Sequence, residues 1–440
     1  MALTRRRVAT PARSAPPDAP RLGPLVLHGW LDPSVVVLAL FAMASGFGQF
    51  GAISALSDVA KAFGHASRGT TISDQAGLSG TVLGVGLAVL RIASLGGLPL
   101  SGLADRFGRR SMLILTCAFG LALTVLAALS PGFWWFIAIL ALGRPFLSAT
   151  NALAQVGAAE ETGTRDRAKA IALIAAGYAL GSGVTAVLEG LAVGTLGFRG
   201  IFALASVPLV GVLLLRRWVV ESDRFTIAAA ALDHPTPVFG AVRRPYRGRL
   251  VLVATLALAV SVVTGPANNF VLLYAKSFLH LSGGARSAMV VVAGPIGLIG
   301  LLAGRWLADR VGRRFAAALS MVGMATAAMV AYSGSHVGLY LGYELAAISG
   351  GCFAPGAGAL ANELFPTSVR ASVAGWNVAA SVVGAVLGLV VFGSVADVGN
   401  RFSVAAVCTF GPMILAAGLF FLLPETKGRE PEELWPDAQQ

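Results

Sequence analysis

The sequence predicts an all-α membrane protein in which twelve transmembrane helices form two six-helix repeats, with both termini in the cytoplasm. Three observations predict this fold class. Of the 440 residues, 56% are hydrophobic and only 12% are charged, which is too few charges for a water-soluble surface. Twelve apolar segments are each long enough to cross a bilayer, which takes ~20 residues of helix. Charged motifs recur between these segments at an offset of 203 or 204 residues.

The apolar segments divide the chain into five parts. We expect a disordered cytoplasmic tail over 1–33, a six-helix bundle over 34–217, a cytoplasmic loop over 218–249, a second six-helix bundle over 250–423 and a cytoplasmic tail over 424–440. The tail over 1–33 is basic and proline-rich and lacks the apolar run of a cleavable signal peptide. The runs are too long and continuous for barrel strands, so they are predicted as helices. They lie near 34–57, 75–100, 111–130, 133–156, 168–193, 198–217, 250–274, 287–308, 315–333, 337–360, 372–395 and 402–423.

The formal net charge of +12 reflects the topology of the chain in the membrane, because the cations lie in short clusters between apolar runs. Nucleic-acid binding would need a continuous basic face, so no nucleic-acid partner is expected. With both termini in the cytoplasm, 25 Lys and Arg residues fall on the cytoplasmic side, six fall outside, and Arg91 and Arg144 lie within the membrane. Cytoplasmic loops are rich in Lys and Arg, so this distribution determines the orientation.

Three pairs of charged motifs carry the internal repeat. SGLADRFGRR, residues 101–110, follows the second predicted helix, and RWLADRVGRR, residues 305–314, follows the eighth. The other two pairs match Glu160 and Arg167 with Glu363 and Arg370, and Glu221 with Glu425. One half is therefore a copy of the other, and this parallel duplication is expected of a transporter whose site lies between the halves.

The loop motif can be interpreted physically. Asp105 and Asp309 can accept hydrogen bonds from a nearby helix N-terminus or pair with arginine. Gly108 and Gly312 permit a tight turn. The motif also contains Arg106 and Arg310, and four further arginines that can hold the turn at the anionic membrane surface: Arg109, Arg110, Arg313 and Arg314.

The motif L-A-D-R-x-G-R-R, present twice, resembles the loop signature of the major facilitator superfamily. E-L-F-P-T-S-V-R and P-E-T-K-G-R resemble its sugar-porter and organic-acid-symporter branches. The resemblance covers about Ser34 to Arg429 and implies the major facilitator fold, with transport by alternating access. It also implies that the ten motif residues form a cytoplasmic latch, supported by a network of Glu160, Arg167, Glu221, Glu363, Arg370 and Glu425.

Charges within the apolar segments are the first candidates for a substrate site, because a central Arg costs ~3 kcal/mol to insert in a membrane. Arg144, Arg91 and Glu344 lie in the fourth, second and tenth predicted helices. In one interpretation Arg144 binds an anionic group of the substrate and Glu344 carries a coupling proton. In the other, Arg144 and Glu344 neutralise each other and hold the halves in register. Glu189 lies nearer the membrane surface, and we expect it to be solvated.

Uncharged polar residues supply the other candidates. Gln49 and the pair Asn268 and Asn269 occupy corresponding places in the two repeats, beside glycine or proline. Asn151, Tyr343 and Asn377 could add hydrogen bonds or stacking. Buried amides also bond between helices for packing alone, so a purely structural role stays open for each of them.

The sequence therefore predicts a multi-pass protein of the cell membrane that is not an enzyme. It has no nucleotide-binding motif, nucleophile triad or metal-ligand spacing, so no metal and no cofactor is expected. We expect a monomeric secondary transporter of a small anionic or polar metabolite, by proton symport. A proton-driven drug or metabolite efflux antiporter and a non-transporting receptor or assembly partner are the alternatives.

Overall fold

The computed structural model describes residues 29–67, 69, 71–162, 166–219, 244–399 and 401–428. Glu221 lies outside the described residues, as do the side chains of Asp105 and Arg167 and most of the two tails and the central loop.

The first half contains nine described α-helices. They are α1 (Pro33–Ser54), α2 (Leu56–Phe63), α3 (Ile72–Ala76), α4 (Gly80–Ala93), α5 (Gly97–Phe107), α6 (Arg109–Ala127), α7 (Phe133–Glu161), α8 (Arg167–Ala203) and α9 (Ser206–Leu215). A 3₁₀ turn, η2 (Ser94–Gly96), joins α4 to α5. Gly197, with φ 62°, breaks the helical geometry of α8 where the fifth predicted segment gives way to the sixth.

The second half contains six described α-helices. They are α11 (Arg244–Ser277), α12 (Gly283–Arg310), α13 (Arg313–Ala331), α14 (His336–Glu363), α15 (Thr367–Gly399) and α16 (Phe402–Ala416), which continues as the 3₁₀ helix η3 (Ala417–Leu422). Across both halves, the described residues form twelve spans long and apolar enough to cross a membrane, which confirms the predicted helical membrane protein.

The first two predicted segments differ from the structure in their ends. The first helix breaks at Ala55 and resumes as α2, and the second span begins at Gly80 instead of residue 75. The intervening residues form α3, which Thr71 caps at its start and Gly77 ends with φ 94°. The segments between the first two spans therefore form short helices outside them.

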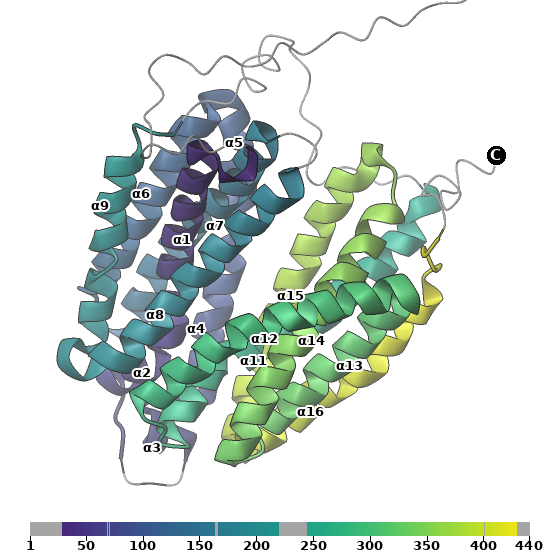
Figure 1. Ribbon diagram of the computed structural model, residues 1–440. Coiled ribbons are helices and arrows are strands. Elements are labelled where there is room, and N and C mark those ends of the chain that lie inside the picture. Colours follow the sequence, from purple (N-terminus) through teal and green to yellow (C-terminus); the bar gives the residue numbers. More distant parts are fainter. Residues whose placement is uncertain are drawn as a thin grey trace, which may run out of the picture.

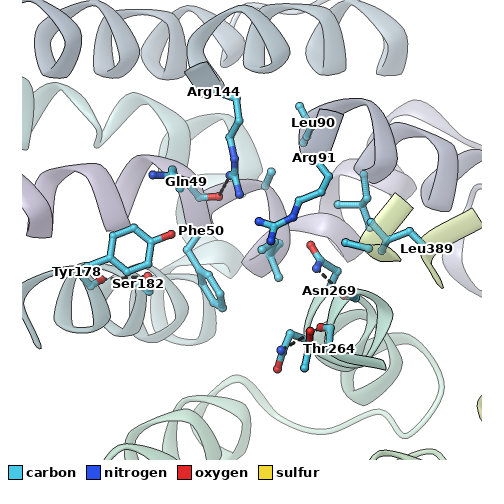
Figure 2. Close-up of a pocket in the computed structure, with 16 residues that line it drawn as sticks. Gln49, Phe50, Leu90, Arg91, Arg144, Tyr178, Ser182, Thr264, Asn269 and Leu389 are labelled. Atoms are coloured by element: carbon cyan, nitrogen blue, oxygen red, sulfur yellow. Dashed lines mark hydrogen bonds between the residues drawn. The ribbon is translucent and has the colours of Figure 1, made fainter. Parts of the chain in front are cut away.

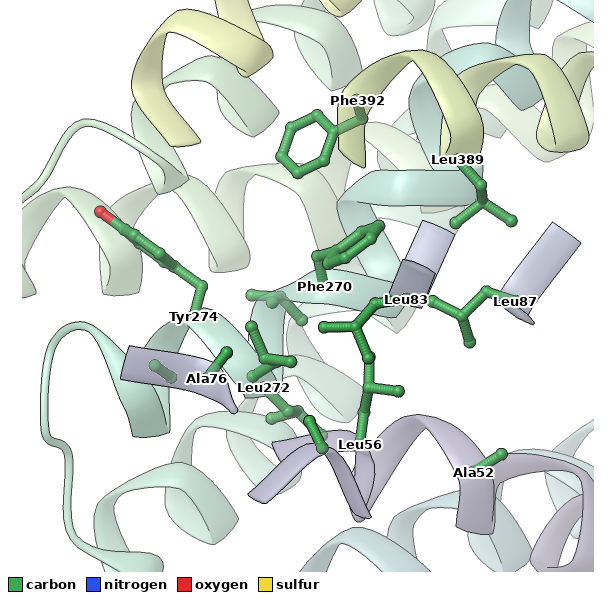
Figure 3. Packing of buried hydrophobic residues seen from close by; sticks show 14 of the residues in the cluster. Ala52, Leu56, Ala76, Leu83, Leu87, Phe270, Leu272, Tyr274, Leu389 and Phe392 are labelled. Carbon is green, nitrogen blue, oxygen red and sulfur yellow. The ribbon is translucent and has the colours of Figure 1, made fainter. Parts of the chain in front are cut away.

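The two halves meet at one end of the molecule and diverge towards the other (Figure 1). We name the end that carries α2 and α3 the far side, and the opposite end, where α1 begins and α16 ends, the terminal side. The largest apolar cluster crosses between the halves on the far side, with Leu56 and Leu83 from the first half against Phe270, Leu389 and Phe392 from the second (Figure 3). Two other clusters each lie within one half. Apolar burial therefore joins the halves on the far side.

Glycine allows close approach at this far-side interface. A Cβ atom on Gly84 of α4 would collide with the backbone of Leu389 in α15, and one on Gly190 of α8 would collide with the backbone of Gly283 in α12. Asp397, near the end of α15, accepts hydrogen bonds from the backbone N–H groups of Gly80 at 2.7 Å and Thr81 at 2.8 Å. The N-terminus of α4 is therefore capped by the other half of the molecule.

Candidate functional site

A cavity of about 230 Å³ lies between the halves. Its walls come from α1, α4, α7 and α8 of the first half and from α11 and α15 of the second. Five of the predicted site residues line it: Gln49, Arg91, Arg144, Asn268 and Asn269. None of the 16 described residues that line it is acidic. The structure therefore brings together the two arginines and three of the amides selected from the sequence.

The side chain of Arg144 is anchored to the backbone of α1. Its Nη1 donates a hydrogen bond to the carbonyl oxygen of Gln49 at 2.7 Å, while its Nε is buried and has no partner among the described residues. The side chain of Gln49 is held in turn, because its Nε2 donates to Ser45 Oγ at 2.9 Å. One nitrogen of the guanidinium thus holds the group against α1.

Arg91, near the end of α4, points into the same space as Arg144 (Figure 2). Its side chain forms no ion pair or hydrogen bond with the described residues. Tyr178 of α8 lines the same cavity. The cavity therefore contains two cations and no carboxylate among the described residues that line it.

The amides of α11 face the arginines from the second half. Asn268 Nδ2 donates to the carbonyl of Thr264 at 3.0 Å, and Asn269 Nδ2 donates to that of Gly265 at 2.6 Å. Each side-chain amide thus donates an N–H to a backbone carbonyl of its own helix. In Figure 2 the Asn269 side chain points towards Arg91.

A second cavity of about 260 Å³ lies within the second half, against α11, α12, α13 and α14. It shares Thr264 and Asn268 with the first cavity and is also lined by Tyr332 and the predicted residue Tyr343. The hydroxyl of Tyr332 is already used, since it donates to the carbonyl of Ala267 at 3.1 Å. Tyr343 makes no hydrogen bond with the described residues.

Glu344 lies apart from both cavities. Its Oε2 is buried and has no hydrogen-bond partner among the described residues, and Glu344 lines neither of the two cavities just described. It forms no ion pair with Arg144 within the described parts of the chain. The interpretation in which these two charges neutralise each other is therefore wrong for this structure.

Two other predicted amides do not reach the central cavity. Asn377 lines a separate cavity of about 170 Å³ between α11, α14 and α15, and Asn151 of α7 lines none of these three cavities. The Oδ1 atoms of both are buried without a hydrogen-bond partner among the described residues.

The repeated loop motif adopts similar geometry in the two halves on the terminal side. Gly108 and Gly312 have φ values of 89° and 142°, the region that favours glycine. Each is followed by an arginine that pairs with a glutamate at the end of the fourth or tenth predicted helix: Arg109 with Glu160 and Arg313 with Glu363. The sequence offset thus corresponds to equivalent contacts.

The other motif residues lie nearer the surface. Arg106 is exposed, and Arg110 Nη2 donates to the carbonyl of Arg216 at 3.4 Å. The Asp309 side chain is 65% exposed, 3.9 Å from Arg305, and Arg310 lies over the ring of Trp306. Asp309 therefore does not cap a helix in this conformation, in which the halves diverge on its side.

Glu425 caps a helix on the terminal side. It accepts hydrogen bonds from the backbone N–H groups of Arg313 at 2.9 Å and Arg314 at 3.4 Å, at the start of α13. Partial burial raises the pKa of Glu425, but the N–H groups of Arg313, Lys427, Arg314 and Thr426 outweigh this and hold its pKa below the usual value. Nearby, Arg370 Nη2 donates to the carbonyl of Phe365 at 3.2 Å.

The far side contains a charge cluster that the sequence did not predict. Glu189 of α8 is only 1% exposed, so the expectation that it is solvated is wrong. It contacts Arg286 Nη2 at 2.9 Å and Lys276 Nζ at 3.0 Å, and Lys276 also pairs with Asp58 at 2.5 Å. Both acids belong to the first half and both cations to the second. Position in the sequence placed these residues near the membrane surface, where solvation is the usual outcome, and gave no sign of the packing of α8 against α12.

Sequence reasoning also missed Tyr178, Ser182 and Thr264, which line the central cavity. The signal for Tyr178 was present, because it is a polar aromatic residue between Gly177 and Gly181. A Cβ on either glycine would collide with the α1 backbone, so α8 packs tightly against α1 there. No group of three or more His, Cys, Asp or Glu able to hold a metal ion occurs in the described part of the chain.

The chain is similar to known membrane transporters. A family model described as Major Facilitator Superfamily matches residues 38–337 and 287–438. The "Probable 4-methylmuconolactone transporter" of Cupriavidus pinatubonensis is 27% identical over 80% of this chain and 84% of its own length. The "Cis,cis-muconate transport protein" of Acinetobacter baylyi is 24% identical over 74% of this chain and 79% of its own.

The fold is also found among solved structures. An inward open conformation of the xylose transporter XylE from E. coli superposes with a TM-score of 0.71, at 19% identity, over 91% of this chain and 98% of the other. At this identity the likeness concerns the fold, while the family match covers most of the sequence. The chain is a multi-pass membrane transporter, not an enzyme, and belongs to the Major Facilitator Superfamily.

Proposed function

We propose that this protein imports a small organic anion across the cell membrane by alternating access, in symport with protons. The observation that carries the proposal is the pair of arginines, Arg91 and Arg144, that face one cavity between the halves without a described acidic partner. A buried cation without a counter-charge is costly in a membrane protein. An anionic substrate would supply that charge, and the planar guanidinium is suited to binding a carboxylate through two hydrogen bonds.

The relatives support a carboxylate. One is named for cis,cis-muconate, a dicarboxylate, and another for a methylmuconolactone. Two guanidinium groups in one cavity match the charge of a dicarboxylate, and both could also bind the single carboxylate of a monoanion. A neutral sugar would leave both arginines unpaired.

Alternating access is supported by how the halves meet. Apolar packing, close glycine contacts and ion pairs join them on the far side, and they diverge towards the terminal side (Figure 1). If the Lys and Arg bias places the terminal side in the cytoplasm, this is the inward-facing state. Transport would then require the far-side contacts to open.

Glu344 is the acid we assign to proton coupling. A buried carboxylate oxygen without a described partner is costly to hold charged within a membrane, so this group is suited to bind a proton there. It follows Tyr343, which lines the second cavity, so a change in that cavity can alter the surroundings of Glu344.

Uptake into proteoliposomes tests the proposal. With the full chain and radiolabelled cis,cis-muconate, we expect uptake driven by an inward proton gradient and no uptake of D-xylose. Arg144→Gln and Arg91→Gln should each lower muconate uptake ~100-fold. The matched control Arg401→Gln, which removes an exposed arginine outside the spans, should leave it unchanged.

Other outcomes would identify the alternatives. Flux that requires the opposite gradient would indicate an efflux antiporter. An absence of gradient-dependent flux across a panel of carboxylates would overturn the proposal and favour a receptor or assembly partner. In Glu344→Gln we expect counterflow exchange of muconate to persist while uphill uptake is lost; loss of both would contradict the assignment of Glu344 to the proton.

A further inference from the structure

The two cavities have different chemistry. Arg91 and Arg144 line the first, whereas none of the 16 described residues that line the second is charged. The walls of the second cavity on α13 and α14 consist mostly of small residues, among them Ala328, Ala346 and Ala347. One cavity is thus suited to a charged group and the other to an apolar one.

The two cavities lie next to each other along α11. Thr264 and Asn268 line both of them, and they lie one helical turn apart on the same face of that helix. A ligand whose carboxylate is held by the arginines would reach the second cavity by extending past these two residues. The boundary between the two cavities is therefore formed in part by two short polar side chains.

The second cavity offers few partners to a polar ligand. The Tyr332 hydroxyl is already bonded to a backbone carbonyl, which leaves Tyr343, Thr264 and Asn268. If the part of the ligand beyond its carboxylate carried several hydroxyl groups, most of them would stay unpaired in this cavity, which is unfavourable. An apolar body would instead gain from burial.

We propose that the second cavity receives the apolar body of the transported anion, and that Ala346 and Ala347 of α14 limit the size of that body. The substrate class is then a carboxylate with a compact apolar or aromatic body and at most one or two polar groups. This inference rests on the proposed function, since it requires an anion at the arginines. It assigns the two ends of the substrate to different halves of the transporter.

The size of the body provides the test. Purified full-length protein is titrated with butyrate, benzoate and 2-naphthoate, and binding is followed by the shift in unfolding temperature. Ala346→Leu and Ala347→Leu should each weaken binding of 2-naphthoate about tenfold or more, as methylene-scale changes in apolar pockets do. Butyrate binding should change less than about twofold.

Two further variants complete the design. Met324→Ala enlarges the same cavity from α13 and should improve 2-naphthoate relative to butyrate. The control Leu345→Phe adds bulk on α14 at an exposed residue that lines neither cavity, and should leave the size order unchanged. The readout is the order of the three ligands within each variant, so a general loss of stability does not imitate the expected result.

The two proposals fail in different ways. If no carboxylate stabilises the wild type, the proposed function fails. If the wild type responds and Arg144→Gln does not, but the α13 and α14 variants keep the wild-type size order, then the anion site stands and the apolar subsite is refuted.

Discussion

The central cavity and the far-side interface both hold charges among apolar helices, but only the interface pairs them. On the far side, Glu189 lies between Arg286 and Lys276, and Lys276 also contacts Asp58. In the central cavity, Arg91 and Arg144 have no described acidic neighbour. The far-side acids belong to one half and their cations to the other, whereas both cavity arginines belong to the first half.

Under the proposed function, this difference separates charges that stabilise a conformation from charges that bind a ligand. Removing one member of a buried pair leaves its partner uncompensated, which costs ~3–5 kcal/mol. Removing an unpaired cation relieves a cost already present. Loss of a paired interface charge should therefore lower stability, whereas loss of a cavity arginine should leave stability unchanged or raise it. The first change should affect transport through the conformation, and the second through substrate binding.

The largest effect is expected for Arg144→Gln. Uptake of an anionic substrate should fall ~100-fold, because a hydrogen bond to a charged group contributes up to ~3 kcal/mol. The unfolding temperature should stay the same or rise, since the unpaired charge is gone. Initial uptake rates and thermal unfolding, measured on one preparation, check both parts. A marked fall in stability would show that Arg144 has a structural role.

Glu189→Gln should have the opposite signature. It leaves Arg286 and Lys276 without their shared acid, so we expect a loss of ~3 kcal/mol in the stability of the conformation closed on the far side. Substrate affinity measured from the terminal side should change little. A double-mutant cycle of Glu189→Gln with Arg286→Gln provides the control, and strictly additive effects would contradict the pairing.

The sequence predicted the fold and only part of the site. The number of helices depends on local composition, and the repeat depends on one constant offset, so both could be predicted from the sequence. The distinction between Glu189 and Arg144 could not, because both are single charges in apolar segments. Which one meets an opposite charge depends on packing between helices about 100 residues apart, such as α8 against α12.

The same limit explains the other errors. Glu344 and Arg144 were candidates for an ion pair because corresponding helices of each half should line the cavity. The rotation of a helix about its own axis determines which of its side chains face a cavity. Glu344 lines neither cavity. The role of Asp397 as a cap on α4 could not be predicted from the sequence. A carboxylate near the end of a helix is common, and this cap forms only between the halves.

Asp397→Ala should have a smaller effect than Glu189→Gln. It removes the cap at the start of α4, where Asp397 accepts from two backbone N–H groups and from Thr81 Oγ1 at 2.5 Å. Loss of such a cap costs ~1 kcal/mol. Thermal unfolding of Asp397→Ala, Thr81→Val and the double variant measures it. The double variant should be less destabilised than the sum, because both changes remove the same hydrogen bond.

The smallest effect is expected for Glu425→Gln, on the terminal side. Like Glu189, this acid has partners, but it is partly exposed and its partners lie within its own half. Its pKa lies below the usual value in the folded state, so its contribution to stability is complete above that usual value and disappears as the pH falls through the folded pKa. Glu425→Gln should therefore lower the unfolding temperature at pH 7, and the gap from wild type should close in strongly acidic solution. A gap of constant size across this pH range would mean that the charge of Glu425 is not what the N-terminus of α13 requires, and would confine the stabilising role of paired acids to the interface between the halves.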